Sequence, residues 1–168
     1  AEALENELQL SDGDMSAFIR LGNDLTESYY EIQIPLTVTP FNSTSPDQIW
    51  PVENRFELSL DLLQQLKSLQ RGSGEGLADA DAAGVIYAND GALDGAKEGY
   101  KYGIKGNPSF GDVRIAMIGV RNNTNTDICG EVWFNELRLS ELKNEGGWAA
   151  VASLDANFAD FANVSATG

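Results

Sequence analysis

The stretch YYEIQIPL, residues 29–36, decides the fold class, because apolar and polar residues alternate along it. Its even-numbered residues are all apolar and share one face, whereas Glu31 and Gln33 take the other face. An alternation with a period of two predicts a half-buried β-strand. Pro35 has no N–H to donate, so we expect the strand at an edge of its sheet or Pro35 near the end of the strand.

Further runs with strand character lie on both sides of this stretch and are separated by turn residues. The run VRIAMIGV at 113–120 is apolar apart from Arg114, which predicts a central strand buried on both faces. Short strands of this kind favour a mainly β fold, an antiparallel β-sandwich. The other predicted strands are residues 17–21, 56–60, 100–104 and 131–139.

One segment has helical spacing instead. Asp61 is the predicted N-cap, Gln64 follows it in capping-box spacing, and Gly72 is placed to end the helix. We therefore expect one short amphipathic helix over residues 61–71, packed on the sheet. Residues 72–99 are rich in Gly, Ala and Asp, so we expect a long variable loop that is dispensable for the fold.

Composition argues against several classes of function. The 168 residues include 26 acidic and 11 basic side chains, and the formal net charge of −15 disfavours nucleic acid as a partner. The chain has no histidine, which removes the commonest general base and most zinc sites. We interpret the single Cys129 as an inert packing residue. No apolar run reaches the roughly 18 residues of a transmembrane helix.

A weak calcium-loop pattern begins at Asp79. Asp79, Asp81 and Asp90 stand at positions one, three and twelve of an EF-hand loop, and Gly84 stands at position six. Ala83 replaces the ligand expected at position five, and Asp90 is shorter than the usual glutamate. A solvated loop is the alternative interpretation, and we favour it. We expect no cofactor other than this calcium candidate.

Glu136 is the other candidate for chemistry, because it lies among aromatic residues in the predicted strand 131–139. A glycosidase needs a second carboxylate across a cleft, and the sequence identifies none. An ion pair with Arg138 on the same strand face is the simpler interpretation, so we expect no enzymatic activity. Aromatic residues could also form a sugar-stacking platform, although they more often lie in the core: Trp50, Trp133, Tyr29 and Tyr30.

The final segment, residues 146–168, has a longer alternation. After Trp148 the even-numbered positions are apolar except Asp160, and the odd-numbered positions include small polar residues. This pattern predicts the start of a transmembrane β-barrel strand, with lipid on one side, water on the other and Trp148 at the interface. An ordinary amphipathic strand fits the pattern equally well.

Several blocks of the chain closely resemble the SprA family, the giant outer-membrane translocon subunits of the type IX secretion system in gliding and secreting Bacteroidota. The most specific block is GEVWFNELRL at 130–139, followed by GGWAA at 146–150. The resembling blocks are residues 19–36, 49–67, 104–124 and 130–168.

The resemblance implies a very large β-barrel through which folded cargo crosses the outer membrane. Residues 1–145 would be a soluble β-sandwich insertion, with 72–99 as its variable loop, and residues 146–168 would begin the barrel. More loosely, VWFNELRL at 132–139 is similar to the last strand of galactose-binding-like jelly rolls, which favours a sandwich of that type. The implied partners are the rest of the barrel chain, other secretion-system subunits, secreted cargo, and outer-membrane lipid at 148–168. A carbohydrate-binding β-sandwich module of a bacterial surface protein is the alternative, although it has no use for the alternation after Trp148.

The resemblance also allows an expectation about location. In outer-membrane barrels the periplasmic turns are short and the extracellular loops are long. An insertion of more than a hundred residues therefore fits the extracellular side, while a docking domain on the periplasmic side is the alternative. Ala1 is not an initiator methionine and Gly168 interrupts a pattern, so we expect the chain to be part of a longer protein.

Overall fold

The computed structural model describes residues 10–138, 153–158 and 162–167. The chain divides into two compact units, Ala1–Gly130 and Glu131–Gly168. The sequence-based boundary between residues 145 and 146 lies outside the described residues.

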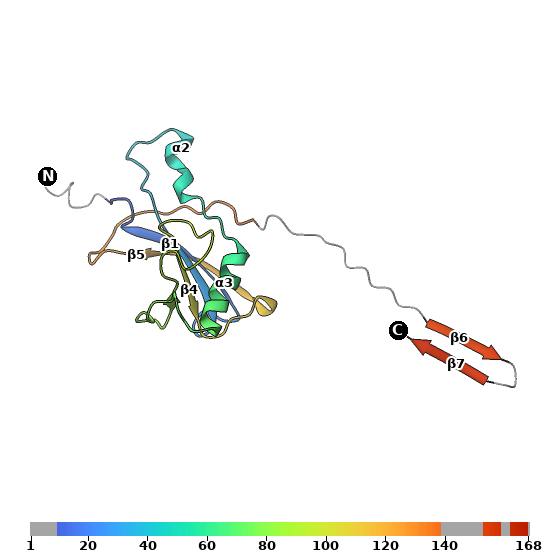
Figure 1. Cartoon of the computed structure of the whole chain (residues 1–168). Coiled ribbons are helices and arrows are strands. Elements are labelled where there is room, and N and C mark those ends of the chain that lie inside the picture. Colours follow the sequence, from blue (N-terminus) through green and yellow to red (C-terminus); the bar gives the residue numbers. More distant parts are fainter. Residues whose placement is uncertain (1–9, 139–152, 159–161, 168) are drawn as a thin grey trace, which may run out of the picture. The chain divides into compact units, whose positions relative to one another are not determined.

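A five-stranded antiparallel sheet forms the centre of the first unit, in the order β3-β4-β2-β1-β5 (Figure 1). The mainly β class expected from the sequence is confirmed. The strands are β1 (Met15–Gly22), β2 (Tyr29–Pro35), β3 (Ile86–Tyr87), β4 (Lys101–Lys105) and β5 (Ile115–Asn122).

The loop at residues 23–28 joins β1 to β2. The Asp24 carboxylate accepts hydrogen bonds from the backbone N–H groups of Thr26, Glu27 and Ser28 at 2.8, 2.5 and 3.2 Å. This satisfies donors that the turn would otherwise leave free. A Cβ atom at Gly22 would collide with the carbonyl oxygen of Ser28, so the close approach at this turn requires glycine.

β2 lies between β4 and β1 and is buried on both faces. Tyr30 and Ile32 are fully buried on one face, and Glu31 and Gln33 are buried on the other. The predicted strand is confirmed, with Pro35 as its last residue. The expectation that it is half-buried is wrong, because side chains from neighbouring strands and from β3 also cover the polar face.

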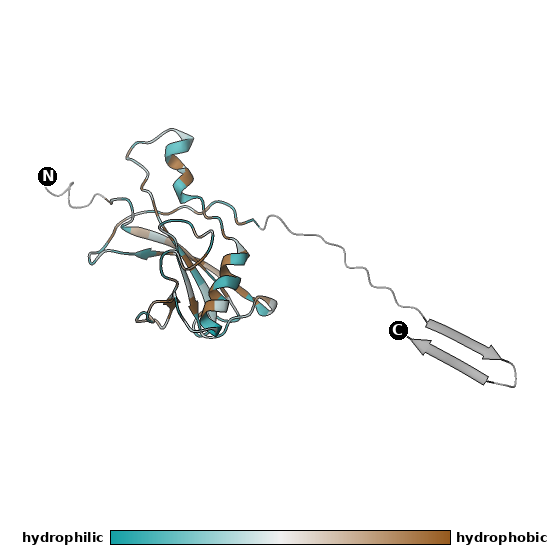
Figure 2. Ribbon diagram, viewed as in Figure 1, coloured by the Kyte–Doolittle hydropathy of each residue, from teal (hydrophilic) through white to brown (hydrophobic). Residues whose placement is uncertain are grey.

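Helix α3 (Leu60–Arg71) covers the apolar face of the sheet. Figure 2 shows hydrophilic and hydrophobic bands along its ribbon, as expected for an amphipathic helix. The predicted helix is confirmed, but its N-cap is Ser59, whose side chain accepts from the Asp61 N–H at 3.3 Å. The core that the helix shares with the sheet contains Tyr30, Ile32, Leu62, Leu63, Leu66, Leu93, Tyr102 and Ile104.

The connections contain three short helical turns, which are α2 (Pro46–Ile49), η1 (Val52–Asn54) and η2 (Phe110–Asp112). The strand predicted over 56–60 is wrong. Residues 55–59 have no strand assignment, and Phe56 and Leu58 are partly buried against the core beside α3. Their apolar alternation therefore reflects packing against the core, with no sheet pairing in the described residues.

The position of β5 differs from the prediction. Among the described residues β1 is its one strand neighbour, so β5 is an edge strand. Ile115 and Ile118 are 42% and 39% exposed. A central strand buried on both faces is therefore wrong for this run, because the helix layer packs against β4 and β2 and leaves β5 open.

Residues 72–99 contribute to the core, contrary to the expectation of a dispensable loop. Val85 is fully buried, Leu93 is 4% exposed, and the segment supplies β3. An isolated antiparallel β-bridge between Leu77 and Ala88 connects two parts of this segment. These contacts could not be predicted from the sequence, because the buried apolar residues of this segment do not recur with a regular period.

In the second unit, β6 (Ser153–Phe158) and β7 (Ala162–Thr167) pair as an antiparallel hairpin. Trp148 lies outside the described residues. No strand is assigned over 131–138, so the strand predicted there is wrong for these residues. Glu136 has a φ of 55°, which interrupts an extended conformation.

A helix and loop segments cover the sheet within the described residues. The second sheet of the expected β-sandwich is not among them, and the sandwich stays a prediction.

Candidate functional site

Polar side chains gather on the face of the sheet opposite α3. The strand register places Arg20 of β1 directly opposite Glu31 of β2, and Gly103 of β4 opposite Glu31 on the other side. Tyr87 of β3 pairs with Gly103, and Arg121 lies on β5. Residues from five strands therefore meet around one carboxylate.

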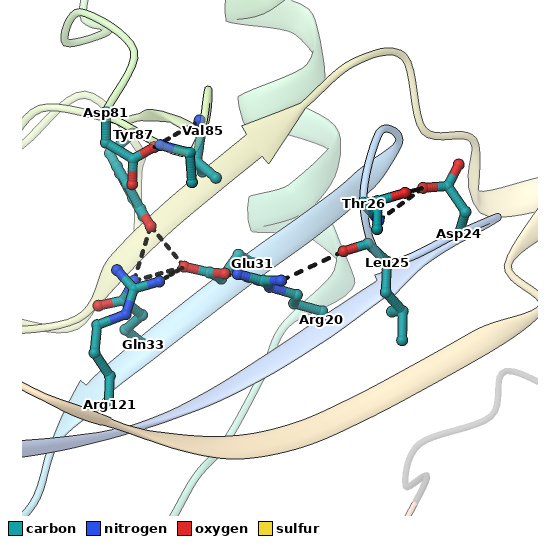
Figure 3. A network of polar contacts seen from close by, with 11 residues as sticks. Arg20, Asp24, Leu25, Thr26, Glu31, Gln33, Asp81, Val85, Tyr87 and Arg121 are labelled. Atoms are coloured by element: carbon teal, nitrogen blue, oxygen red, sulfur yellow. Dashed lines mark hydrogen bonds and ion pairs between the residues drawn. The ribbon is translucent and has the colours of Figure 1, made fainter.

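Glu31 accepts four hydrogen bonds, and Figure 3 shows its carboxylate between two arginines. Arg20 Nε donates to Oε2 at 2.5 Å. Oε1 accepts from the Tyr87 hydroxyl at 2.6 Å, from Gln33 Nε2 at 2.6 Å and from Arg121 at 3.2 Å. We call these five residues the Glu31 cluster. The side chain of Glu31 is fully buried, so its charge is paired and its hydrogen-bonding capacity is used.

Arg20 is held in place by more than its ion pair. Its guanidinium lies over the Tyr29 ring at 4.5 Å and over the Phe18 ring at 5.3 Å. A further hydrogen bond runs from Arg20 to the carbonyl oxygen of Leu25 at 3.3 Å. Cation–π contacts of this kind keep a guanidinium in one orientation, which aims it at Glu31.

Two glycines leave room for aromatic rings on this face. A Cβ atom on Gly103 would lie 2.7 Å from the Tyr87 ring and 2.7 Å from Val85. A Cβ atom on Gly119 would lie 2.6 Å from the Phe18 ring. The lack of a side chain at Gly103 and at Gly119 thus allows the rings of Tyr87 and Phe18 to lie against the sheet.

Burial alone would raise the pKa of Glu31. Hydrogen bonds from Tyr87, Gln33 and Arg20, with the positive charge of Arg20, outweigh it and hold the pKa below the usual glutamate value. Burial and the bond to Glu31 raise the pKa of Tyr87, which keeps its hydroxyl protonated as a donor.

This arrangement is suited to holding strands together and is poorly suited to proton transfer. A general acid or base needs a free oxygen within reach of substrate, and both oxygens of Glu31 are engaged inside the fold. Two surface clefts lie elsewhere, one beside Gln65 of α3 and one beside Tyr100.

The residues of the predicted calcium loop are placed differently. Asp81 accepts hydrogen bonds from the N–H groups of Ala83 and Val85, both at 2.9 Å, and so organises a turn. In the described part of the chain no group of three or more His, Cys, Asp or Glu residues is arranged to hold a metal ion. The calcium site at Asp79, Asp81 and Asp90 gains no support from this geometry and stays a prediction.

Glu136 pairs with Arg138 at 2.6 Å, as the simpler interpretation predicted. Tyr29 and Tyr30 are both buried, on opposite faces of β2, so they cannot stack on a sugar together. Cys129 is exposed, which corrects its interpretation as a packing residue.

Sequence reasoning missed the Glu31 cluster. The signal available was the pair of polar residues on a strand that also carries Tyr29 and Tyr30, but the alternation alone was equally consistent with a solvated face. The partner Arg121 is 90 positions away in the sequence, and only the sheet order brings it to Glu31.

Comparison with known proteins gives one match. The family model described as motility related/secretion protein (SprA_N) matches residues 1–168. No curated protein and no solved structure showed significant similarity to the chain. In the described residues no helix is both long enough and apolar enough to cross a membrane. Because the family model spans the whole sequence, the chain belongs to the SprA_N family of motility and secretion proteins.

Proposed function

We propose that this chain is a structural, non-catalytic part of an outer-membrane translocon that serves protein secretion and gliding motility. Family membership supports a role in motility and secretion. The observation that carries the structural role is the Glu31 cluster, because the most elaborate set of charged contacts in the described residues is closed and joins strands.

The β6–β7 hairpin is the part that would begin the barrel. Its register pairs Ala156 with Val164 and Asn157 with Asn163, so residues of even number stand opposite residues of even number. One face of the ribbon is therefore apolar in sequence and the other is polar. Outer-membrane strands alternate in this way, with apolar residues toward lipid and polar residues toward the lumen.

A matched pair of substitutions in the full-length native protein tests the barrel assignment. Ala156→Arg places a charge on the lipid-facing side, where it costs about 2–4 kcal/mol near the bilayer midplane. Asn157→Arg places the same charge on the lumen side of the adjacent position. We expect the first variant to be depleted from outer membranes and to lose secretion, and the second to assemble normally.

Equal assembly of the two variants would contradict the barrel assignment. Normal assembly of both with loss of secretion in both would place the hairpin in contact with cargo or another subunit instead of lipid.

We propose the extracellular side of the outer membrane for the first unit, because insertions of this size fit long extracellular loops. The loop at residues 123–127 follows β5 and is mostly exposed. A cysteine introduced at Asn123 would perturb its bonds to Gly13 and Ser16, so Asp127→Cys is the better site. Exposed Cys129 is first replaced by Ser.

We expect a membrane-impermeant maleimide to label Asp127→Cys on intact cells. Labelling that required permeabilisation of the outer membrane would place the unit in the periplasm, as a docking surface for soluble secretion subunits. The proposed partners are the rest of the barrel chain, other secretion subunits, cargo, and lipid at 148–168.

A further inference from the structure

The connection between β2 and α3 leaves the sheet and returns to it at a clamp. The Thr37 N–H donates to the Asn54 side-chain oxygen at 2.7 Å, and the Asn54 side-chain amide donates to the Thr37 carbonyl oxygen at 2.8 Å. The Val38 N–H also donates to Asp12 at 2.7 Å. Residues 38–53 therefore form a loop that is closed at its base, and loops of this kind are frequently functional. We call it the α2 loop, and Figure 1 shows α2 standing clear of the sheet.

The α2 loop buries little of its own apolar surface. None of the residues in its two helical turns, α2 and η1, is buried. Phe41 is 92% exposed, Val52 is 72% exposed and Trp50 is 47% exposed. Fixing the backbone costs about 1–2 kcal/mol per residue in conformational entropy, and burial within this loop offsets little of that cost. Exposed apolar side chains on a shaped loop are typical anchors of a protein interface.

The turn that carries Phe41 has its shape before a partner binds. The Ser43 N–H and the Ser43 hydroxyl both donate to the Pro40 carbonyl oxygen, at 3.1 and 2.7 Å. Asn42 is the third residue of this turn and has a φ of 60°, which asparagine tolerates. An anchor that is already held in place loses less entropy on binding than a flexible one.

A cleft of about 520 Å³ lies beside the base of the α2 loop, and Val52 and Glu53 of the loop line it. Pro35, Leu36 and Tyr100 line the cleft from neighbouring segments and give it apolar surface. A long basic side chain can lay its alkyl stem along such a surface and keep its charged end near water. The cleft thus offers room for a Lys or Arg side chain next to an exposed apolar residue of the loop.

The charges around the cleft favour a cation. Arg55 and Lys97 also line it, but both pair with Glu57, at 3.1 and 2.9 Å. Glu53 and Glu98 are exposed, and neither forms an ion pair within the described part of the chain. The α2 loop contains no basic residue, and the whole chain carries a net charge of −15. A basic partner is therefore attracted both from a distance and at the contact.

We propose that the α2 loop binds a segment of a partner polypeptide that combines apolar residues with Lys or Arg. Apolar side chains of the partner pack on the exposed apolar side chains of the loop, and a basic side chain enters the cleft beside Glu53 and Glu98. The apolar contacts supply most of the affinity, and the carboxylates select basic segments over acidic ones. A second copy of the chain would bring the same large negative charge. The proposal rests on this loop and its cleft and does not depend on the translocon role.

The test uses the 168-residue chain labelled with ¹⁵N and a short synthetic peptide of alternating Leu and Lys, at physiological salt. We expect the peptide to bind and to shift the amide signals of residues 38–53. Phe41→Ser is expected to weaken binding by roughly tenfold or more, and the exposure of Phe41 means that the variant should still fold. The matched control is Phe134→Ser, which removes the same side chain from a residue that is 55% exposed and lies outside the α2 loop. This control should leave binding unchanged.

The cleft is tested by a change of charge alone. Glu53→Gln is expected to weaken binding about two- to fivefold, because it removes one exposed partner of the incoming cation. Glu75→Gln removes an exposed carboxylate that does not line the cleft and should have no effect. Equal effects of the two changes would overturn the role of the cleft.

Two further peptides decide the chemistry of the partner. A peptide of alternating Ser and Lys keeps the charge and loses the apolar residues, and a peptide of alternating Leu and Glu reverses the charge. Binding of either as strong as that of the Leu–Lys peptide would overturn the proposal, and so would failure of the Leu–Lys peptide to bind. Shifts of the loop amides that grew with chain concentration, without peptide, would identify a second copy as the occupant and would also overturn it.

Discussion

At the scale of single residues, Glu31 behaves unlike most acidic side chains of this strongly acidic chain. It is fully buried in the middle strand of the sheet, between Arg20 and Arg121. A buried charge is tolerated only when its partners replace the water it has lost. Glu31 is therefore stable in the core only when the strands that carry its partners have packed beside β2.

Replacing Glu31 by Gln tests this directly. The amide keeps the shape of the side chain but removes the charge that pairs with Arg20 and Arg121. We expect a loss of about 2–3 kcal/mol in the free energy of unfolding, measured in urea. The matched control is Glu57→Gln, which breaks an exposed ion pair with Lys97 and is expected to leave stability unchanged. Equal effects of the two changes would contradict a special role for Glu31.

The glycines beneath the aromatic rings allow a second test. Gly119→Ala would drive its new methyl group into the Phe18 ring, which lies beside Arg20. We expect a loss of about 1–3 kcal/mol in stability, because the ring has to shift away from the added methyl group and from its contact with the Arg20 guanidinium. Gly111→Ala is the control, since its Cβ would meet its nearest neighbour, Ser109, at 3.7 Å. A tolerated Gly119→Ala would show that Phe18 moves aside at no cost.

At the scale of elements, the segment between α3 and β4 packs as a part of the core. Leu93 is 4% exposed and lies in the same cluster as Leu63 and Leu66 of α3. Leu93→Ala is therefore expected to cost about 2–5 kcal/mol, measured by thermal or urea unfolding. Leu60→Ala removes the same atoms from a residue that is 46% exposed and should cost far less. Similar losses of stability in the two variants would contradict a role for Leu93 in the core and would support the expectation that residues 72–99 are a dispensable loop.

The strands that could be predicted from sequence are those in which the apolar pattern agrees with pairing and burial in the sheet. β1, β2, β4 and α3 all appear close to their predicted bounds. The periodic pattern of 56–60 instead reflects packing beside a helix, and the apolar run of β5 belongs to an edge. Local pattern reports which residues are apolar, but the order of strands in a sheet is decided by contacts between distant segments.

The candidate site was harder to predict than the fold for the same reason. Glu136 and Asp81 drew attention because their sequence neighbours resembled known patterns. Apart from Gln33 on the same strand, Glu31 has its partners at positions 20, 87 and 121. None of these is close in sequence, so no motif marks the cluster.

At the scale of the whole molecule, the Glu31 cluster predicts how stability depends on pH. The pKa of Glu31 is lowered in the folded chain relative to the ordinary value of 4.5. A lowered pKa contributes stability that is complete above the unfolded value and is lost as the pH falls through the folded value. We therefore expect the difference in unfolding free energy between the wild type and Glu31→Gln to be constant near neutrality. It should shrink as the pH falls below about 4.5.

Unfolding curves of the two proteins between pH 7 and pH 3 provide the measurement. A difference that did not change over this range would mean that the pKa of Glu31 is the same in the folded and the unfolded chain, and it would contradict the prediction.

The same cluster also sets an order for folding during synthesis. Glu31 leaves the ribosome 90 residues before Arg121, and 56 residues before Tyr87. Until those residues emerge, closing the sheet around Glu31 would desolvate a carboxylate with part of its partners missing. The early strands are thus kept from completing a premature core, and the sheet closes once its last strand has been made. That delay lengthens the time during which the nascent domain stays open to chaperones.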